Sequence, residues 1–138
     1  MSQENVQAVV AMYDAFARGD IDGVLAGLAP DVHWSVAENF IYSAGNPYRG
    51  IEAVRNGVFG RVPGDWDSYN LEFEEIIDAG ETVVSRGRYL AKHKRTGAAV
   101  SAQFAHVFKF REGKIALFQQ YTDTAQFRDA MVSAAPRQ

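Results

Sequence analysis

The chain has 138 residues, of which 47% are hydrophobic and 12% aromatic, and this composition suits a single domain with a sizeable core. It has no cysteine, so disulfides, thiolate nucleophiles and cysteine-bound metals are excluded. The formal net charge of −3 argues against a nucleic-acid partner, because phosphate backbones require a basic surface.

Targeting and cofactor signals are missing from the sequence. No apolar run approaches the ~20 residues of a membrane span, and the N-terminal MSQENVQ lacks the basic-then-apolar layout of a signal peptide. We therefore expect a cytoplasmic protein without a membrane partner. The three histidines form no pair with metal-ligand spacing, and no glycine loop of the phosphate-binding kind is present, so neither a metal nor a cofactor is expected.

Two helices are predicted at the start of the chain. Apolar residues recur at three- and four-residue steps over 6–17, Ser2 can cap this first helix, and Gly19 can end it. Asp20 is typical of an N-cap, and Pro30 would stop the short helix that follows. The apolar stripe of that second helix comprises Ile21, Val24, Leu25 and Leu28.

The middle of the chain combines a short strand, a loop and a third helix. Residues 32–36 are expected to form the strand, and the polar run 37–50 reads as a long ordered loop, a kind of segment that often carries function. The third helix is predicted over 51–62, where the break at Pro63-Gly64 ends it.

Everything after that break is predicted as strand, apart from a short final helix. Short turns separate long runs of strand-forming residues, which indicates an antiparallel meander. An amphipathic segment at 126–131 follows, and we expect one domain over residues 1–132 with a frayed tail at 133–138. The four strands are expected at 66–77, 82–94, 98–110 and 114–122.

The order of these elements predicts an α+β fold. Helices come first and a long twisted meander comes last, so the sheet can curl around the N-terminal helices. Such a curl encloses a cavity, and the side chains on the inner faces of the strands then decide the function.

Two strands carry candidate site residues in alternation. Phe104, His106 and Phe108 share one face, so His106 is either a satisfied wall residue or a group that hydrogen-bonds a ligand oxygen or orients a carboxylate. Arg86 and Arg88 also share a face, but alternation does not say whether it looks inward. Turned inward, they would need carboxylate partners.

The stretch GKIALFQQYTDT ends in a carboxylate, Asp123. A carboxylate at the mouth of an apolar pocket can act as a general acid or base, because desolvation raises its pKa and a neighbouring arginine lowers it. Alternatively, Asp123 caps the final short helix. Strict alternation predicts that it shares a face with Ile115, Leu117, Gln119 and Tyr121.

The early strand and the loop after it supply further candidates. Trp34 and His33 alternate, and the tryptophan is the better pocket wall because it combines a large apolar area with a single donor. Glu38 and Asn39 follow at the start of the loop. There they either close one end of the pocket or satisfy loop backbone groups.

The order of elements, with FARGDIDGVLAGLAPDVHW near the start and HVFKFREGKIALFQQYTD near the end, resembles the nuclear transport factor two-like cone fold over nearly the whole chain. Within that fold the chain is most similar to SnoaL-like and ketosteroid-isomerase-related proteins, and more distantly to limonene epoxide hydrolase. The resemblance implies a cone-shaped α+β barrel, with the N-terminal helices packed in a strongly curved antiparallel sheet. It also implies a homodimer.

The resemblance also implies residue roles. Asp123 matches the catalytic aspartate of SnoaL-like cyclases, and His106 matches a protonated aspartate in the oxyanion hole of the isomerases. Val36 stands in place of the isomerase's general base and Met12 in place of its oxyanion tyrosine, so ketosteroid isomerisation is not expected. Arg88 stands where the epoxide hydrolases place their proton-donating aspartate.

Together these residues predict a cofactor-independent small-molecule enzyme. Asp123 is expected to move a proton on a hydrophobic substrate that carries a carbonyl or hydroxyl group, while the second catalytic residue, His106, stabilises the oxygen together with Tyr121. Three alternatives stay open: a non-catalytic binding module, a limonene-epoxide-hydrolase-like hydrolase, and a scaffold that uses the fold only to dimerise. The expected substrate-binding side chains are Trp34, Tyr121, Gln119, Arg86, Arg88, Glu38, Phe104 and Phe108.

Overall fold

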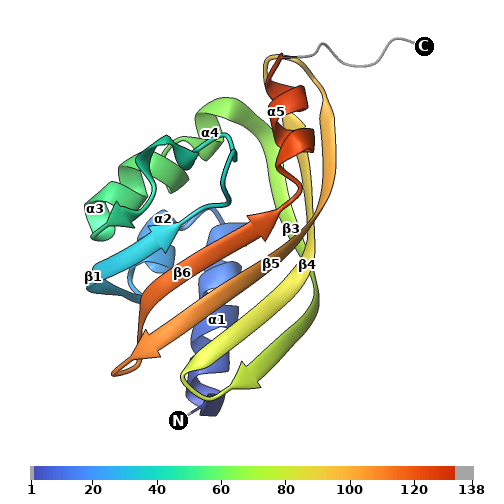
Figure 1. The fold of residues 1–138 in the computed structure, drawn as a ribbon. Coiled ribbons are helices and arrows are strands. Elements are labelled where there is room, and N and C mark those ends of the chain that lie inside the picture. The colour runs from blue at the N-terminus through green and yellow to red at the C-terminus, as the bar shows by residue number, and fades with distance from the viewer. Residues whose placement is uncertain (1, 133–138) are drawn as a thin grey trace.

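The computed structural model describes residues 2–132 and contains a six-stranded sheet in the order β2-β1-β6-β5-β4-β3 (Figure 1). The first two strands are β1 (Leu28–Ser35), parallel to β6, and the two-residue β2 (Tyr48–Arg49), antiparallel to β1. The four long strands form the predicted antiparallel meander. They are β3 (Trp66–Ala79), β4 (Thr82–His93), β5 (Ala99–Arg111) and β6 (Lys114–Thr122).

The first helix lies against this sheet. Helix α1 (Ser2–Ala17) packs on β3 and β4, and Gly19 follows it with a φ of +75°, which only glycine adopts readily. Asp20 caps α2 (Ile21–Leu25) by accepting a hydrogen bond from the Gly23 N–H, as predicted. The capping role of the Ser2 side chain lies outside what the structure describes.

The predicted α+β class is confirmed. The N-terminal helix lies in the curve of the long strands, while α2 and the helices after β2 gather beside β1 (Figure 1). Because β2 and β3 form the two edges and do not pair with each other, the sheet curves without closing. Among residues 2–132, none of the helices is both long and apolar enough to cross a bilayer.

Pro30 does not stop the second helix as predicted. Helix α2 ends earlier, and both Leu28 and Pro30 belong to β1. The pairing of β1 with β6 changes register between Leu28 and His33, so the interval that holds Pro30 is irregular. A residue without an N–H is tolerated in a strand at such a position.

The predicted third helix is divided into three parts. Helix α3 (Ile51–Val54) continues into a wider π turn over Arg55–Phe59, and α4 (Val62–Asp65) follows. Pro63 lies in the first turn of α4, where a missing N–H costs no hydrogen bond, so it begins a helix instead of ending one.

The long loop is partly ordered into secondary structure, and the chain ends in a helix. A single 3₁₀ turn, η1 (Ser43–Gly45), precedes β2. Helix α5 (Thr124–Val132) packs against β5 and buries Phe127 and Ala130. The tail expected at 133–138 lies outside the described residues, so its fraying stays a prediction.

Alternation along β4 and β5 sorts their side chains into an inner and an outer face. On β5 the predicted row of Phe104, His106 and Phe108 is buried, whereas on β4 the buried residues include Ser85 and Tyr89. Alternation therefore places Arg86 and Arg88 on the outer face of the sheet.

Gly87, on the inner face of β4, is predicted to tolerate no side chain. A Cβ atom there would overlap the Glu72 carbonyl oxygen and lie 3.0 Å from the Phe73 Cα, both backbone atoms of β3. Gly87→Ala is therefore expected to lower the free energy of unfolding by about 3 kcal/mol, measured by urea denaturation. Gly64→Ala is the control, because nothing lies within 4 Å of the added atom, and it is expected to change stability by less than about 1 kcal/mol. Equal stabilities of the two variants would contradict the tight contact.

Candidate functional site

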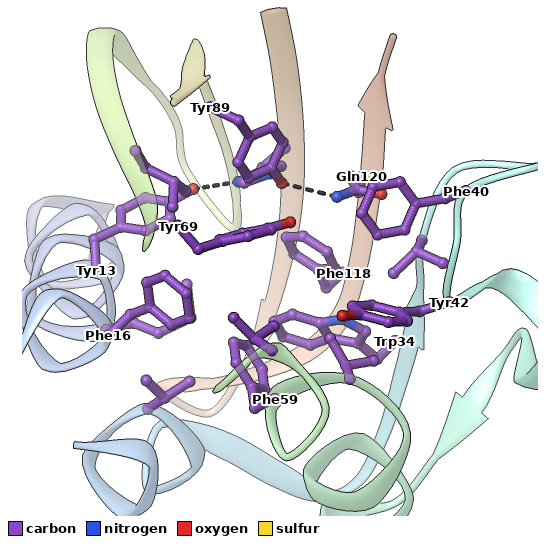
Figure 2. A pocket seen from close by; sticks show the side chains of 17 residues that line it. Tyr13, Phe16, Trp34, Phe40, Tyr42, Phe59, Tyr69, Tyr89, Phe118 and Gln120 are labelled. Carbon is purple, nitrogen blue, oxygen red and sulfur yellow. Dashed lines mark hydrogen bonds between the residues drawn. The ribbon is translucent and has the colours of Figure 1, made fainter. Parts of the chain in front are cut away.

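A cavity lies between α1, the concave face of the sheet and the segments after β1 (Figure 2). Its volume is about 60 Å³, counted as the space open to the centre of a water molecule, whereas one water needs roughly 10–15 Å³ on that measure. The walls are mostly aromatic. The Trp34 ring stacks on Phe118 with 3.8 Å between centroids, and Phe59 meets Trp34 edge-on at 5.4 Å.

His106 is the centre of the polar part of this wall. Its Nδ1 lies 2.6 Å from the Tyr13 hydroxyl, and its Nε2 lies 2.7 Å from the Tyr89 hydroxyl. Tyr13 comes from α1, while Tyr89 and His106 come from neighbouring strands of the sheet. The imidazole is thus fixed between two phenols, and all three side chains line the cavity.

Hydrogen bonds extend from this centre in both directions. The Tyr13 hydroxyl lies 2.6 Å from the Ser85 hydroxyl, and Gln120 Nε2 donates to the Tyr89 hydroxyl at 2.8 Å. Each of these groups is buried. We call Ser85, Tyr13, His106, Tyr89 and Gln120 the tyrosine–histidine chain; part of it is drawn in Figure 2.

Every group of the tyrosine–histidine chain is neutral near pH 7. Burial lowers the pKa of His106 to about 3, so its imidazole carries no charge. Burial also raises the pKa of Tyr13, Tyr69 and Tyr89 above the ordinary value for a phenol. Among the described residues that line the cavity there is no carboxylate, lysine or arginine, so the site works through neutral hydrogen bonds.

Asp123 does not point toward the interior of the protein, so that part of the prediction is wrong. The register of β6 against β5 shifts where Lys109 pairs with Leu117 and Phe110 pairs with Ile115, which leaves one extra residue on β6. This bulge reverses the alternation, so Gln120 points inward and Asp123 is exposed. The Asp123 carboxylate instead accepts a hydrogen bond from the Gln126 side chain, 2.9 Å away in the first turn of α5.

The two arginines are likewise not brought to the cavity. Arg86 donates to Glu74 at 2.6 Å and to Glu75 at 2.8 Å on the outer face of the sheet. Arg88 donates to the Ser101 carbonyl oxygen at 3.0 Å. Because they face solvent, they need no buried carboxylate partner.

The remaining predicted residues divide into three groups. Trp34 lines the cavity as expected. Glu38, Gln119 and Tyr121 line a separate surface groove beside the loop, because the bulge also turns β6 residues 119 and 121 outward. Phe104 and Phe108 are buried, but they pack around His106, with 4.2 Å between the centroids of Phe104 and His106, and do not line the cavity.

Sequence reasoning missed Tyr13, Tyr69, Tyr89 and Gln120. Tyr89 had a signal, since it alternates with Ser85 and Gly87 on the face opposite the arginines. Gln120 had none, because the bulge that turns it inward leaves no mark in the residue pattern. Within residues 2–132, no three histidine or acidic side chains cluster in a way that could hold a metal ion.

Comparison with known proteins adds a family to this geometry. The family model described as SnoaL-like domain matches residues 9–118. An NTF2-like protein from Burkholderia thailandensis is 34% identical, with 92% of this chain and 96% of that chain covered and a TM-score of 0.86. An NTF2-like protein of unknown function from Burkholderia pseudomallei is 31% identical, with 94% and 98% covered and a TM-score of 0.86.

A third solved structure is TerC co-crystallised with polyporic acid. It is 29% identical, with 94% of this chain and 99% of that chain covered, and the TM-score is 0.84. Among curated proteins, none matches the chain.

Proposed function

The chain belongs to the SnoaL-like family of NTF2-like proteins, and from that premise we propose that its cavity binds a hydrophobic molecule of one or two rings through a carbonyl or hydroxyl oxygen. The observation that carries the proposal is His106, held between two phenols in the wall of an aromatic cavity. Such a wall buries an apolar ligand, and a few convergent polar groups fix its orientation. The co-crystal of TerC with polyporic acid supports a small-molecule ligand for this fold.

We further propose that bound substrate undergoes cofactor-independent acid–base chemistry. A phenol of the tyrosine–histidine chain that donates to a substrate carbonyl withdraws electrons from it, so the neighbouring C–H bond gives up its proton to water more readily. Help of this kind contributes typically about 10²–10⁴-fold, which suits substrates whose C–H bonds are already acidic. In this proposal the tyrosine–histidine chain replaces Asp123 as the source of the acid function.

A non-catalytic binding module is the second candidate. It is favoured by the absence of a carboxylate among the described residues that line the cavity, since no strong general base then faces a ligand. Product analysis separates the two candidates, because only an enzyme converts the ligand that it binds.

The test is a ligand screen in a Trp66→Phe background. The chain has two tryptophans, and this variant leaves Trp34, which lines the cavity, as the sole indole emitter. Neutral ketones and phenols of one or two rings are expected to raise the Tm and to change the emission. At a hundredfold excess over Kd a ligand stabilises by about 2.7 kcal/mol. If no compound of the panel alters either signal, the proposal is contradicted. For each compound that does, mass spectrometry looks for a product.

We also propose that two chains pair through the outer face of the sheet. This face carries half-buried apolar side chains at Val84, Leu90, Val107 and Leu117. Light scattering at about 50 µM is expected to give twice the 15.3 kDa mass of one chain. The Val107→Asp variant is expected to scatter as a monomer, because it buries a charge in that interface. A wild-type protein with the mass of one chain would contradict the dimer.

A further inference from the structure

The hydrogen bonds of the tyrosine–histidine chain have a fixed direction at one end. The backbone N–H of Ala37 can only donate, and it points to Gln120 Oε1 at 3.0 Å. This contact fixes the amide orientation, so Gln120 Nε2 must donate to the Tyr89 hydroxyl. The Tyr89 oxygen is therefore an acceptor in this contact, and its own hydrogen must be used elsewhere.

The rest of the tyrosine–histidine chain has one more polar hydrogen than it has hydrogen-bond contacts. Three contacts remain, and they join Ser85 to Tyr13, Tyr13 to His106, and His106 to Tyr89. Each hydroxyl supplies one hydrogen and the neutral imidazole supplies one, so four hydrogens serve three contacts. Either tautomer of the imidazole leaves one hydroxyl hydrogen without an acceptor in the tyrosine–histidine chain. When that hydrogen belongs to Tyr13 or Tyr89, a ligand in the cavity can accept it.

Trp34 supplies a second unused hydrogen. Its indole N–H is buried and donates to no group among residues 2–132, and indole nitrogen cannot accept. Trp34 lines the cavity, and in the view of Figure 2 it lies below the tyrosine–histidine chain. The Tyr69 hydroxyl also lines the cavity, and it can accept as well as donate. Tyr69 can therefore accept a hydrogen bond from a donor group on a ligand. Such a donor group, however, cannot accept either of the two unused hydrogens.

We infer that the ligand is uncharged and presents acceptor oxygens, as a cyclic ketone or a quinone does, to two donors: a phenol of the tyrosine–histidine chain and the Trp34 N–H. One oxygen accepts from a phenol of the chain, and a second, where the ligand has one, accepts from the Trp34 N–H. Charged ligands are disfavoured, because no charged side chain lines the described part of the cavity. The inference rests on the proposed binding function and adds the Trp34 N–H as a second donor to the ligand.

The test compares three probes of similar size by calorimetry or ligand-observed NMR. They are 1-indanone, which only accepts hydrogen bonds, indole, which only donates, and indane, which does neither. If the cavity had no unused donor, 1-indanone would bind more weakly than indane, because its carbonyl would lose its hydrogen bonds to water on binding. We expect it to bind at least about tenfold more tightly than both others, a difference that corresponds to about 1.4 kcal/mol. We also expect the carbonyl stretching frequency of bound 1-indanone to fall below its value in an apolar solvent.

Each contrary result has a distinct meaning. If indane or indole binds as tightly as 1-indanone, the inference is overturned while the proposed binding function stands. If none of the three binds, both are overturned. Val58→Phe, which fills the cavity, is expected to abolish binding, and Val36→Met serves if that variant does not fold. Binding that survives a folded cavity-filling variant lies elsewhere and overturns the inference.

Discussion

Lowering the pH from 6.5 to 4 is expected to destabilise the wild-type protein by about 3 kcal/mol more than a His106→Gln variant. Burial holds the pKa of His106 at about 3 in the folded state, against about 6.5 in an unfolded chain. Between these values the unfolded state binds a proton that the folded state does not bind. The stabilisation is therefore complete above about pH 6.5 and is lost as the pH falls toward 3.

The measurement is urea denaturation of both proteins at the two pH values. Protonation of the carboxylates also lowers stability in acid, but it affects both proteins alike, so the difference between them isolates His106. Glutamine still offers one donor and one acceptor to the two phenols, which favours folding of the variant. The exposed His33 provides a control, and His33→Gln is expected to follow the wild type. Parallel losses for wild type and His106→Gln would show that His106 is not held neutral by burial.

The fold could be predicted because its signals are local. The helical stripe before Gly19, the cap at Asp20 and the short turns between the last four strands each depend on neighbouring residues, and the structure contains all of them. Pro30 misled the prediction because its meaning depends on pairing. A proline ends a helix, but it is also tolerated in the irregular part of a strand, and only the partner strand shows which applies.

The site was predictable only in part, because it depends on which face of each strand looks inward. Alternation placed His106 in a buried row correctly, since β5 has no bulge before its end. On β6 a single extra residue exchanged the two faces, moving Gln120 in and Asp123 out. The side chains that join His106 in the tyrosine–histidine chain come from α1, β4 and β6, so no spacing within one segment could have identified it.

The inward position of Tyr89 and the outward position of Asp123 lead to opposite expectations for the turnover of any substrate that the screen identifies. Tyr89→Phe keeps the ring and removes the hydroxyl, so kcat/KM is expected to fall by about 10²-fold, the loss typical for one donor to a developing oxyanion. It also leaves His106 and Gln120 each short of a partner, so its unfolding must be checked by urea denaturation and activity measured where the variant is folded.

Asp123→Asn is expected to leave kcat/KM within about twofold of wild type, because the carboxylate is exposed, lies outside the cavity lining and contacts Gln126. Asparagine can still accept from Gln126, so stability is expected to hold as well. The reverse pattern, an inactive Asp123→Asn and an active Tyr89→Phe, would return the acid–base role to the carboxylate. It would also require the end of β6 to turn toward the ligand during catalysis, since the bulge directs that side chain away from the cavity.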